Sequence, residues 1–223
     1  MKLLLLGSNG QVGWELQRSM ATLGKLKACD RSTLDFIDLD GLRKLIRDYK
    51  PDVIVNAAAY TDVDKAESDE ENAFQVNSRA VDLLAQEAKV LDAWLVHYST
   101  DYVFDGEKMS PYTEEDKTNP LSVYGKTKLQ GEEAIKKSKC KYLIFRTSWL
   151  YGTHGKNFFK TIIKLAKERD ELRVVSNQIG APTSAELVAD VTSLCLYRIA
   201  QNSLSSKEIS GIYHLTSTGK ASW

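Results

Sequence analysis

Tyr124 and Lys128 are the two residues whose types and spacing most directly suggest chemistry. Side chains four positions apart lie on the same face of a helix. A ketone that accepts hydride needs a proton for the developing alkoxide, and a phenol with a pKa of about 10 is a slow donor at neutral pH. A neighbouring ammonium stabilises the phenolate and lowers that pKa. The pair therefore predicts proton transfer to a carbonyl; an exposed pair on an ordinary helix is the alternative.

Thr100 is a third candidate for the same site. It follows the apolar run at 94–98, which is typical of a buried strand. In open α/β sheets, ligands bind beyond the carboxyl ends of the strands. We therefore expect Thr100 to face the ligand crevice, where its hydroxyl can donate to a substrate oxygen beside Tyr124. Lys128 is also expected to hydrogen-bond the ribose of a nicotinamide cofactor.

Three glycines near the amino terminus predict a dinucleotide site. Gly7, Gly10 and Gly13 follow the first apolar run and open a helical pattern. Gly7 would permit the tight turn, Gly10 the approach of a pyrophosphate, and Gly13 the packing of the helix on the strand. The phosphates would lie at the helix N-terminus. Asp30 stands at the offset of about 20 residues expected of a ribose-binding acid, and Arg31 could accept a 2′-phosphate, so NADH and NADPH both remain open.

Short apolar runs alternate with helical patterns along the whole chain. The predicted strands cover 2–6, 26–29, 52–56, 94–98, 142–145 and 212–215. The predicted helices cover 11–23, 42–49, 73–84, 157–167 and 186–200, with one more running through Lys128. Continuous apolar runs are typical of strands covered on both faces. The alternation predicts a doubly wound parallel sheet of the Rossmann type. We expect a nucleotide-binding domain at 1–148 that carries the catalytic pair, and a small substrate-binding lobe at 149–223.

The composition is that of an ordinary globular protein. Lys+Arg and Asp+Glu number 30 each among 223 residues, so the charge balance predicts neither a nucleic-acid partner nor a membrane surface. No stretch of the sequence approaches the ~20 apolar residues of a membrane span. Cys29, Cys140 and Cys195 have no disulfide or metal spacing, which favours a reducing, cytoplasmic location.

The chain closes shortly after the last predicted strand. Ser222 is expected to cap a further helix. We therefore expect a C-terminal segment to be missing, so that cofactor binding is retained while substrate binding is weak or lost.

Five motifs occur in an order that makes a family resemblance specific. They lie at 7–13, 56–67, 99–104, 124–128 and 146–149. Together they resemble the dTDP-4-dehydrorhamnose reductases, which are extended short-chain dehydrogenases/reductases, and the similarity runs through essentially all 223 residues. The resemblance implies hydride transfer from NADPH or NADH to the C4 ketone of dTDP-4-dehydro-β-L-rhamnose, giving dTDP-L-rhamnose for polysaccharide synthesis.

The resemblance also implies roles for individual residues. Tyr124 would be the general acid, and Thr100 would polarise the carbonyl. Lys128 would lower the pKa of Tyr124 and bind the nicotinamide ribose. Asp101 and Trp149 would contact the sugar, although Trp149 could instead be a core aromatic. The implied cofactor contacts are Gly7, Gly10, Gln11, Val12, Gly13, Asp30, Asp35, Phe36, Ala58, Ala59, Tyr60, Tyr98, Tyr124 and Lys128. Phe36 could equally be ordinary packing.

A magnesium-linked homodimer is a further implication of the resemblance. Glu15 and Glu186 fall at the matching acidic positions. A third carboxylate from the family's C-terminal region has no counterpart in the sequence. Two glutamates on solvated helix faces are the alternative.

Three other functions are alternatives to reduction. Dehydratases of the superfamily carry Asp-Glu after the threonine, whereas the residues here are Asp101 and Tyr102, so the catalytic base is absent. An epimerase is excluded less firmly. A non-catalytic, NADP-binding regulatory subunit, like the β subunit of methionine adenosyltransferase, also resembles these reductases. The intact trio of Thr100, Tyr124 and Lys128 favours catalysis.

Overall fold

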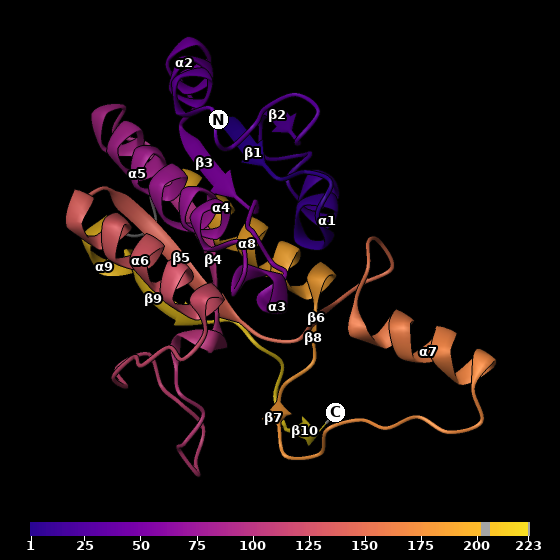
Figure 1. Ribbon diagram of the computed structural model, residues 1–223. Coiled ribbons are helices and arrows are strands. Elements are labelled where there is room, and N and C mark those ends of the chain that lie inside the picture. The colour runs from indigo at the N-terminus through magenta and orange to yellow at the C-terminus, as the bar shows by residue number, and fades with distance from the viewer. Residues whose placement is uncertain (202–205, 223) are drawn as a thin grey trace.

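Six parallel strands form the central sheet (Figure 1). The computed structural model describes residues 1–201 and 206–222. The strands are β1 (Lys2–Leu6), β2 (Lys25–Cys29), β3 (Val53–Asn56), β4 (Trp94–Thr100), β5 (Lys141–Thr147) and β9 (Gly211–His214). Their order is β2-β1-β3-β4-β5-β9. The predicted doubly wound sheet is confirmed, and its order reverses between β1 and β3, where such sheets bind ligands.

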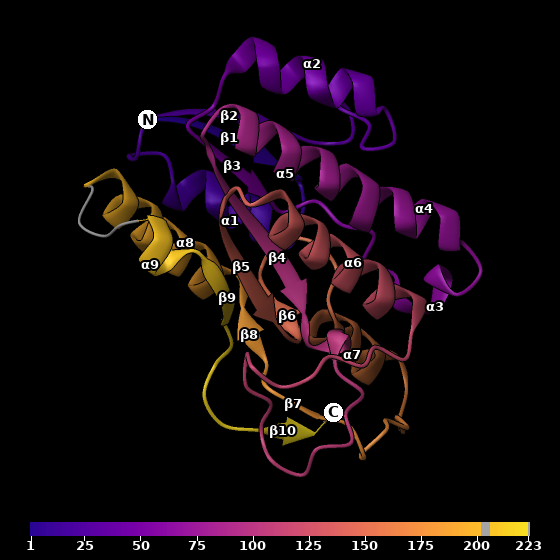
Figure 2. The same ribbon diagram turned by 90° about the vertical axis from the view of Figure 1, so that its left-hand side faces the viewer.

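Helices cover both faces of the sheet, as Figures 1 and 2 show. One face packs against α1 (Gln11–Ser19) and α8 (Ala185–Ala200), and the other against α2 (Leu39–Tyr49), α5 (Ala80–Val90) and α6 (Val123–Ser138). Leu3 and Leu5 point to the first group of helices, whereas Leu4 and Leu6 point to the second. Burial on both faces explains why the strands are continuous apolar runs.

The long helix predicted around residues 73–84 contains a π turn. It consists of α4 (Glu70–Phe74), the π segment η1 (Gln75–Arg79) and α5. Such turns often occur at functional sites. Here η1 carries Asn77, whose amide nitrogen donates to Thr127 Oγ1 on α6 over 3.2 Å. The π segment therefore fixes the helix that carries Tyr124 and Lys128.

The remaining elements are short or lie at the edge of the molecule. They are α3 (Val63–Ala66), the 3-10 turn η2 (Asp101–Val103), β6 (Leu150–Tyr151), α7 (Phe158–Glu168), β7 (Ile179–Gly180), β8 (Thr183–Ser184), α9 (Ser206–Ile209) and β10 (Ala221–Ser222). Helix α7 extends away from the sheet and contains no buried residue (Figure 1). Within the described ranges, no helix is both long and apolar enough to cross a membrane.

Two findings refine the expectations for the second half of the chain. Ser222 lies in β10, opposite Ile179 of β7 in an antiparallel pair. In addition, α8 and β9 follow residue 149 and yet belong to the central layers. The part of 149–223 that stands apart from the sheet is therefore β6, α7, β7, β8 and β10.

Candidate active site

The glycine loop joins β1 to α1 at the point where the strand order reverses. Gly7 has a φ of 81°, and a Cβ there would lie 2.6 Å from the backbone nitrogen of Ala58. A Cβ at Gly13 would collide with the carbonyl oxygen of Gly7. At Gly10, by contrast, a Cβ would come no closer than 3.4 Å to the protein atoms around it. Gly7 and Gly13 are thus required by the fold itself.

The start of α1 at Gly10 suits a phosphate group. Gly10 is the N-cap of α1 and makes no side-chain capping bond. The first N–H groups of a helix then remain available to an anion, and the helix dipole favours negative charge there. These features suit the pyrophosphate of a dinucleotide, and contact with it stays a prediction for Gly10, Gln11 and Val12.

Substitutions at Gly10 and Gly13 should affect different properties, NADPH affinity in the first case and stability in the second. Gly10→Val is expected to weaken NADPH binding by about tenfold or more, because loss of a hydrogen bond to a charged group costs about 1.5–3 kcal/mol. Its Tm should stay near that of the wild type. Gly13→Ala is expected to lower stability by about 1–3 kcal/mol, because the methyl group overpacks against backbone. Calorimetric titration with NADPH and thermal unfolding of both variants measure the two effects; equal stability losses would contradict the assignment.

Asp30 lies where a ribose-binding acid is expected. Gly7 and Ser8 donate to the carbonyl of Cys29 over 2.9 and 3.0 Å, which brings the end of β2 against the glycine loop. The Asp30 carboxylate accepts from the Ser32 hydroxyl at 2.6 Å and from the side chain of Asn9. The hydrogen bond from Ser32 is the main cause that lowers the pKa of Asp30. Asp30 is therefore a fixed carboxylate beside the loop.

Other predicted cofactor residues follow either β2 or β3. Asp35 lies in a turn and accepts from the backbone N–H of Ile37 at 3.0 Å. Phe36 is buried and packs in the core beneath α2 and α5, which agrees with ordinary packing. Ala58, Ala59 and Tyr60 follow β3 at the same edge of the sheet as the glycine loop.

The Tyr98 side chain lies on the face of the sheet that α1 and α8 cover. Its ring packs under α8, and its hydroxyl lies 2.8 Å from Thr192 Oγ1. The hydroxyl is thus occupied within the core, and burial raises its pKa. What Tyr98 presents toward α6 is its carbonyl oxygen.

Lys128 is buried on the inner face of α6, with 2% of its surface exposed. Its Nζ donates to the carbonyl of Tyr98 over 2.6 Å and lies 3.2 Å from Nε2 of His97. Burial disfavours the ammonium and lowers the Lys128 pKa to about 8. A lysine that titrates in this range is typical of functional sites.

Tyr124 and Thr100 meet at the carboxyl end of β4. Ser122 caps α6 by accepting from the N–H of Gly125 at 3.1 Å, so Tyr124 lies in the first turn. Burial is the main influence on the Tyr124 hydroxyl and raises its pKa, while a hydrogen bond with Thr100 opposes that shift. The expectation that Lys128 lowers this pKa is wrong for this arrangement: the Lys128 amino group is directed to Tyr98 and His97, and burial dominates.

Asp101 and Trp149 extend the site toward the second half of the chain. Thr100 Oγ1 donates to Asp101 Oδ1 over 3.1 Å, and burial raises the pKa of Asp101. Trp149 has a φ of 45°, a strained backbone conformation for a bulky residue. Its indole lies so close to Gly180 that a Cβ there would collide with the ring. The half-exposed Trp149 is therefore held against Gly180, and its contact with a sugar stays a prediction.

Several residues at the site were not predicted from the sequence. Asn157 Nδ2 donates to Gln11 Oε1 over 2.9 Å, and the His154 ring stacks on Trp14 with centroids 4.2 Å apart. The loop at 152–157 thus lies against the start of α1. Its glycines and polar residues indicated a loop but gave no indication of where the loop would pack.

Glu15 and Glu186 are brought together by Arg18. The Arg18 guanidinium lies 3.3 Å from Glu15 and 3.7 Å from Glu186, and it also bonds Asp190 at 2.9 Å. A single cation of the protein already pairs with these carboxylates. Within the described ranges, no group of three acidic, histidine or cysteine side chains could hold a metal ion. The magnesium that the resemblance implies at Glu15 and Glu186 stays a prediction.

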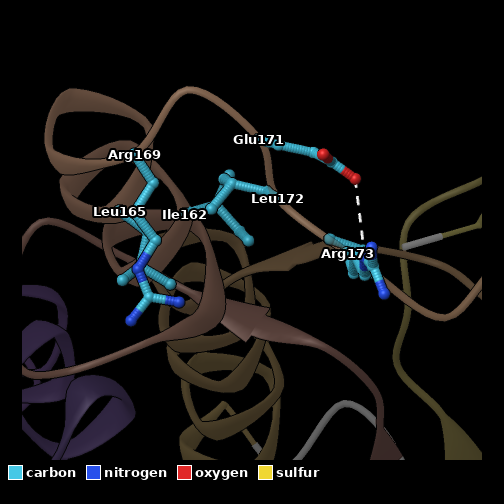
Figure 3. Close-up of a pocket in the computed structure, with 7 residues that line it drawn as sticks. Ile162, Leu165, Arg169, Glu171, Leu172 and Arg173 are labelled. Carbon is cyan, nitrogen blue, oxygen red and sulfur yellow. Dashed lines mark hydrogen bonds and ion pairs between the residues drawn. The ribbon is translucent and has the colours of Figure 1, made fainter.

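A separate hollow lies beside α7 (Figure 3). Ile162, Leu165 and Leu172 point into it, and Glu171 pairs with Arg173 at 3.4 Å on its rim. None of the residues predicted for catalysis lines it. The residues predicted for catalysis lie instead at the carboxyl edge of the central sheet.

The fold and the grouping of Thr100, Tyr124 and Lys128 define a short-chain dehydrogenase/reductase. The RmlD substrate binding domain model matches residues 1–223. The dTDP-4-dehydrorhamnose reductase of Escherichia coli (strain K12) is 49% identical over 227 aligned residues, which cover 100% of this chain and 75% of the relative.

Solved structures agree with the sequence match. A dTDP-4-dehydrorhamnose reductase from Clostridium acetobutylicum superposes with a TM-score of 0.91 at 42% identity, covering 100% of this chain and 76% of the other. One from Bacillus anthracis in complex with NADP gives 0.91 at 35% identity with the same coverage. The chain therefore belongs to the family of the dTDP-4-dehydrorhamnose reductases.

Proposed function

We propose that this protein reduces the C4 ketone of dTDP-4-dehydro-β-L-rhamnose to dTDP-L-rhamnose with NADPH or NADH. The contact between Tyr124 and Thr100 at the carboxyl end of β4 carries the proposal, because it provides two hydroxyls for one carbonyl oxygen. The family membership and the NADP complex of the Bacillus anthracis relative support it.

The chain's own residues would handle the proton and the orientation of the substrate. The nicotinamide cofactor supplies the hydride when bound. Tyr124 donates its proton to the carbonyl oxygen, and its raised pKa keeps the phenol protonated at neutral pH. Thr100 hydrogen-bonds the same oxygen and stabilises the developing charge. Lys128 binds the nicotinamide ribose, while Gly10 and Asp30 hold the phosphates and the adenosine ribose.

We propose that Asp101 and Trp149 contact the sugar nucleotide. Both lie beyond the carboxyl ends of strands, Asp101 after β4 and Trp149 after β5. The elements β6, α7, β7, β8 and β10 would complete the substrate side as the lobe assigned to 149–223.

We also propose a homodimer that acts in the cytoplasm. Leu187, Leu194 and Tyr197 form an exposed apolar row on α8, which supports a contact with a second copy. The free cysteines Cys29, Cys140 and Cys195 support a reducing compartment. Sedimentation of wild-type protein and of Leu194→Glu tests the dimer; an unchanged sedimentation coefficient in the variant would contradict this interface.

Steady-state consumption of cofactor tests the proposed reaction. The full-length protein, supplied with NADPH and dTDP-4-dehydro-β-L-rhamnose, is expected to oxidise many equivalents of NADPH and to form dTDP-L-rhamnose. An epimerase would show no net consumption, since it returns the hydride to its product. A regulatory subunit would bind NADPH without turnover, and either result would overturn the proposal.

The rate should fall at alkaline pH. The Lys128 pKa of about 8 means that the ammonium predominates below pH 8 and is lost above it. The raised pKa of Tyr124 keeps its proton over the same range. We expect kcat/KM to be level below pH 8 and to fall about tenfold per pH unit above it. Lys126→Met removes an exposed lysine from the same helix and should leave the profile unchanged; a profile level to pH 10 in the wild type would contradict the assignment.

A further inference from the structure

A buried row of polar side chains leads from β3 to Lys128. Asn56 and His97 are 1% and 0% exposed and are paired in register on β3 and β4. Asn56 Nδ2 lies 3.1 Å from His97 Nδ1, and His97 Nε2 lies 3.2 Å from Lys128 Nζ. Each ring nitrogen of His97 therefore faces one side chain.

The backbone fixes the orientation of the Asn56 amide. The N–H of Ala58 donates to Asn56 Oδ1 over 3.1 Å, so the oxygen must point toward Ala58. Reversing the amide would set its NH2 group against that N–H. The NH2 group of Asn56 consequently points to His97, and Nδ1 of His97 must accept a hydrogen bond.

An imidazole that accepts at Nδ1 carries its hydrogen on Nε2 when it is neutral. Burial keeps His97 in that neutral form by lowering its pKa well below the usual value. The hydrogen on Nε2 then points at Lys128 Nζ. An ammonium has three donors and no acceptor, so it would oppose this hydrogen, whereas an uncharged amine accepts it with its lone pair.

The other groups facing Lys128 do not remove this conflict. The carbonyl of Tyr98 accepts at 2.6 Å from either form of the lysine. Glu132, one turn along α6, favours the ammonium through its charge. Both of its oxygens, however, accept from the Arg146 guanidinium of β5 at 2.9 and 2.6 Å. Glu132 is therefore not the acceptor that a charged Lys128 needs.

We propose that Asn56 and His97 are positioning residues that oppose the charging of Lys128. Asn56 fixes the hydrogen of His97 on Nε2, and the hydrogen bond that it donates stabilises the uncharged amine of Lys128. When Lys128 takes up a proton, the ammonium loses the bond to His97 and turns to another acceptor, such as a ribose hydroxyl or the Tyr124 phenolate, so the lysine charges at a lower pH than it would without His97. This consequence for turnover rests on the proposed function, but the hydrogen positions do not.

Nitrogen NMR of the protein labelled with 15N-histidine tests the hydrogen positions directly. The chain has 3 histidines, so His154→Gln and His214→Gln suffice to assign His97. In the wild type we expect a hydrogen on Nε2 and none on Nδ1. A hydrogen on Nδ1, or on both nitrogens, would overturn the proposal. Because no substrate is needed, this outcome is independent of whether the protein reduces a nucleotide sugar.

Two variants at Asn56 separate the hydrogen position from charge. Asn56→Asp keeps an acceptor for Ala58 and adds one for Nδ1, so the His97 hydrogen should move to Nδ1. The pH above which kcat/KM falls should then increase by about one unit or more. Asn56→Leu removes the donor without adding charge, and we expect a smaller increase in the pH above which kcat/KM falls. If the pH above which kcat/KM falls changed only in Asn56→Asp, with the His97 hydrogen still on Nε2, charge alone would be acting and the proposal would be overturned.

Discussion

Tyr124→Phe is expected to lower kcat for ketone reduction by about 10²–10⁴-fold, which is the usual contribution of a positioned general acid. The substitution removes the one hydroxyl that meets Thr100 at the end of β4. It retains the ring, which packs edge-on against Tyr102 with centroids 5.6 Å apart. NADPH affinity and Tm should therefore stay close to those of the wild type.

Tyr102→Phe provides a matched control for this variant. Tyr102 lies against the Tyr124 ring and is exposed, and its hydroxyl has no assigned role in the proton transfer. Steady-state assays of both variants should show a large loss of kcat only in Tyr124→Phe. Unchanged turnover in that variant would refute the assignment of the general acid, whatever the result for Tyr102→Phe.

Arg146→Met is expected to lower the free energy of unfolding by about 3–5 kcal/mol, the usual cost of leaving one partner of a buried ion pair alone. Arg146 lies on β5 and pairs with Glu132 of α6 through two hydrogen bonds. Glu132 is fully buried. Without the guanidinium, its carboxylate must remain unpaired in the core or take up a proton.

Urea unfolding measures this effect, and two further variants interpret it. Glu132→Leu combined with Arg146→Met should recover most of the loss, because it removes both charges. Arg173→Met breaks the exposed pair with Glu171 and should change stability by less than about 1 kcal/mol. If Arg146→Met and Arg173→Met had equal effects, the buried pair would not stabilise the fold as described.

The parts of the fold set by local sequence could be predicted. The apolar runs at 2–6 and 94–98 depend on neighbours along the chain, and the structure confirms them as strands. The helix that carries Tyr124 and Lys128 was predicted for the same reason. The pairing of Ser222 with Ile179 could not be predicted, because the two residues are 43 positions apart in the sequence.

The electrostatic surroundings of the site could not be predicted. His97 stands inside an apolar run, and its partners Asn56 and Lys128 are 41 and 31 residues away. The sheet register and the packing of α6 bring these residues together. The direction of Tyr98 likewise depends on which face of β4 turns toward α8. A histidine within a buried strand was the one local sign that a polar network existed there.

Transfer of deuteride from NADPH tests the central claim most directly. The full-length protein is incubated with dTDP-4-dehydro-β-L-rhamnose and NADPH carrying deuterium at C4 of the nicotinamide, on each face in turn. With one of the two labelled cofactors, we predict dTDP-L-rhamnose with one deuterium at C4 of the sugar, and almost none of this product with Tyr124→Phe. Product without deuterium from both cofactors, or deuterium at another carbon, would contradict the account.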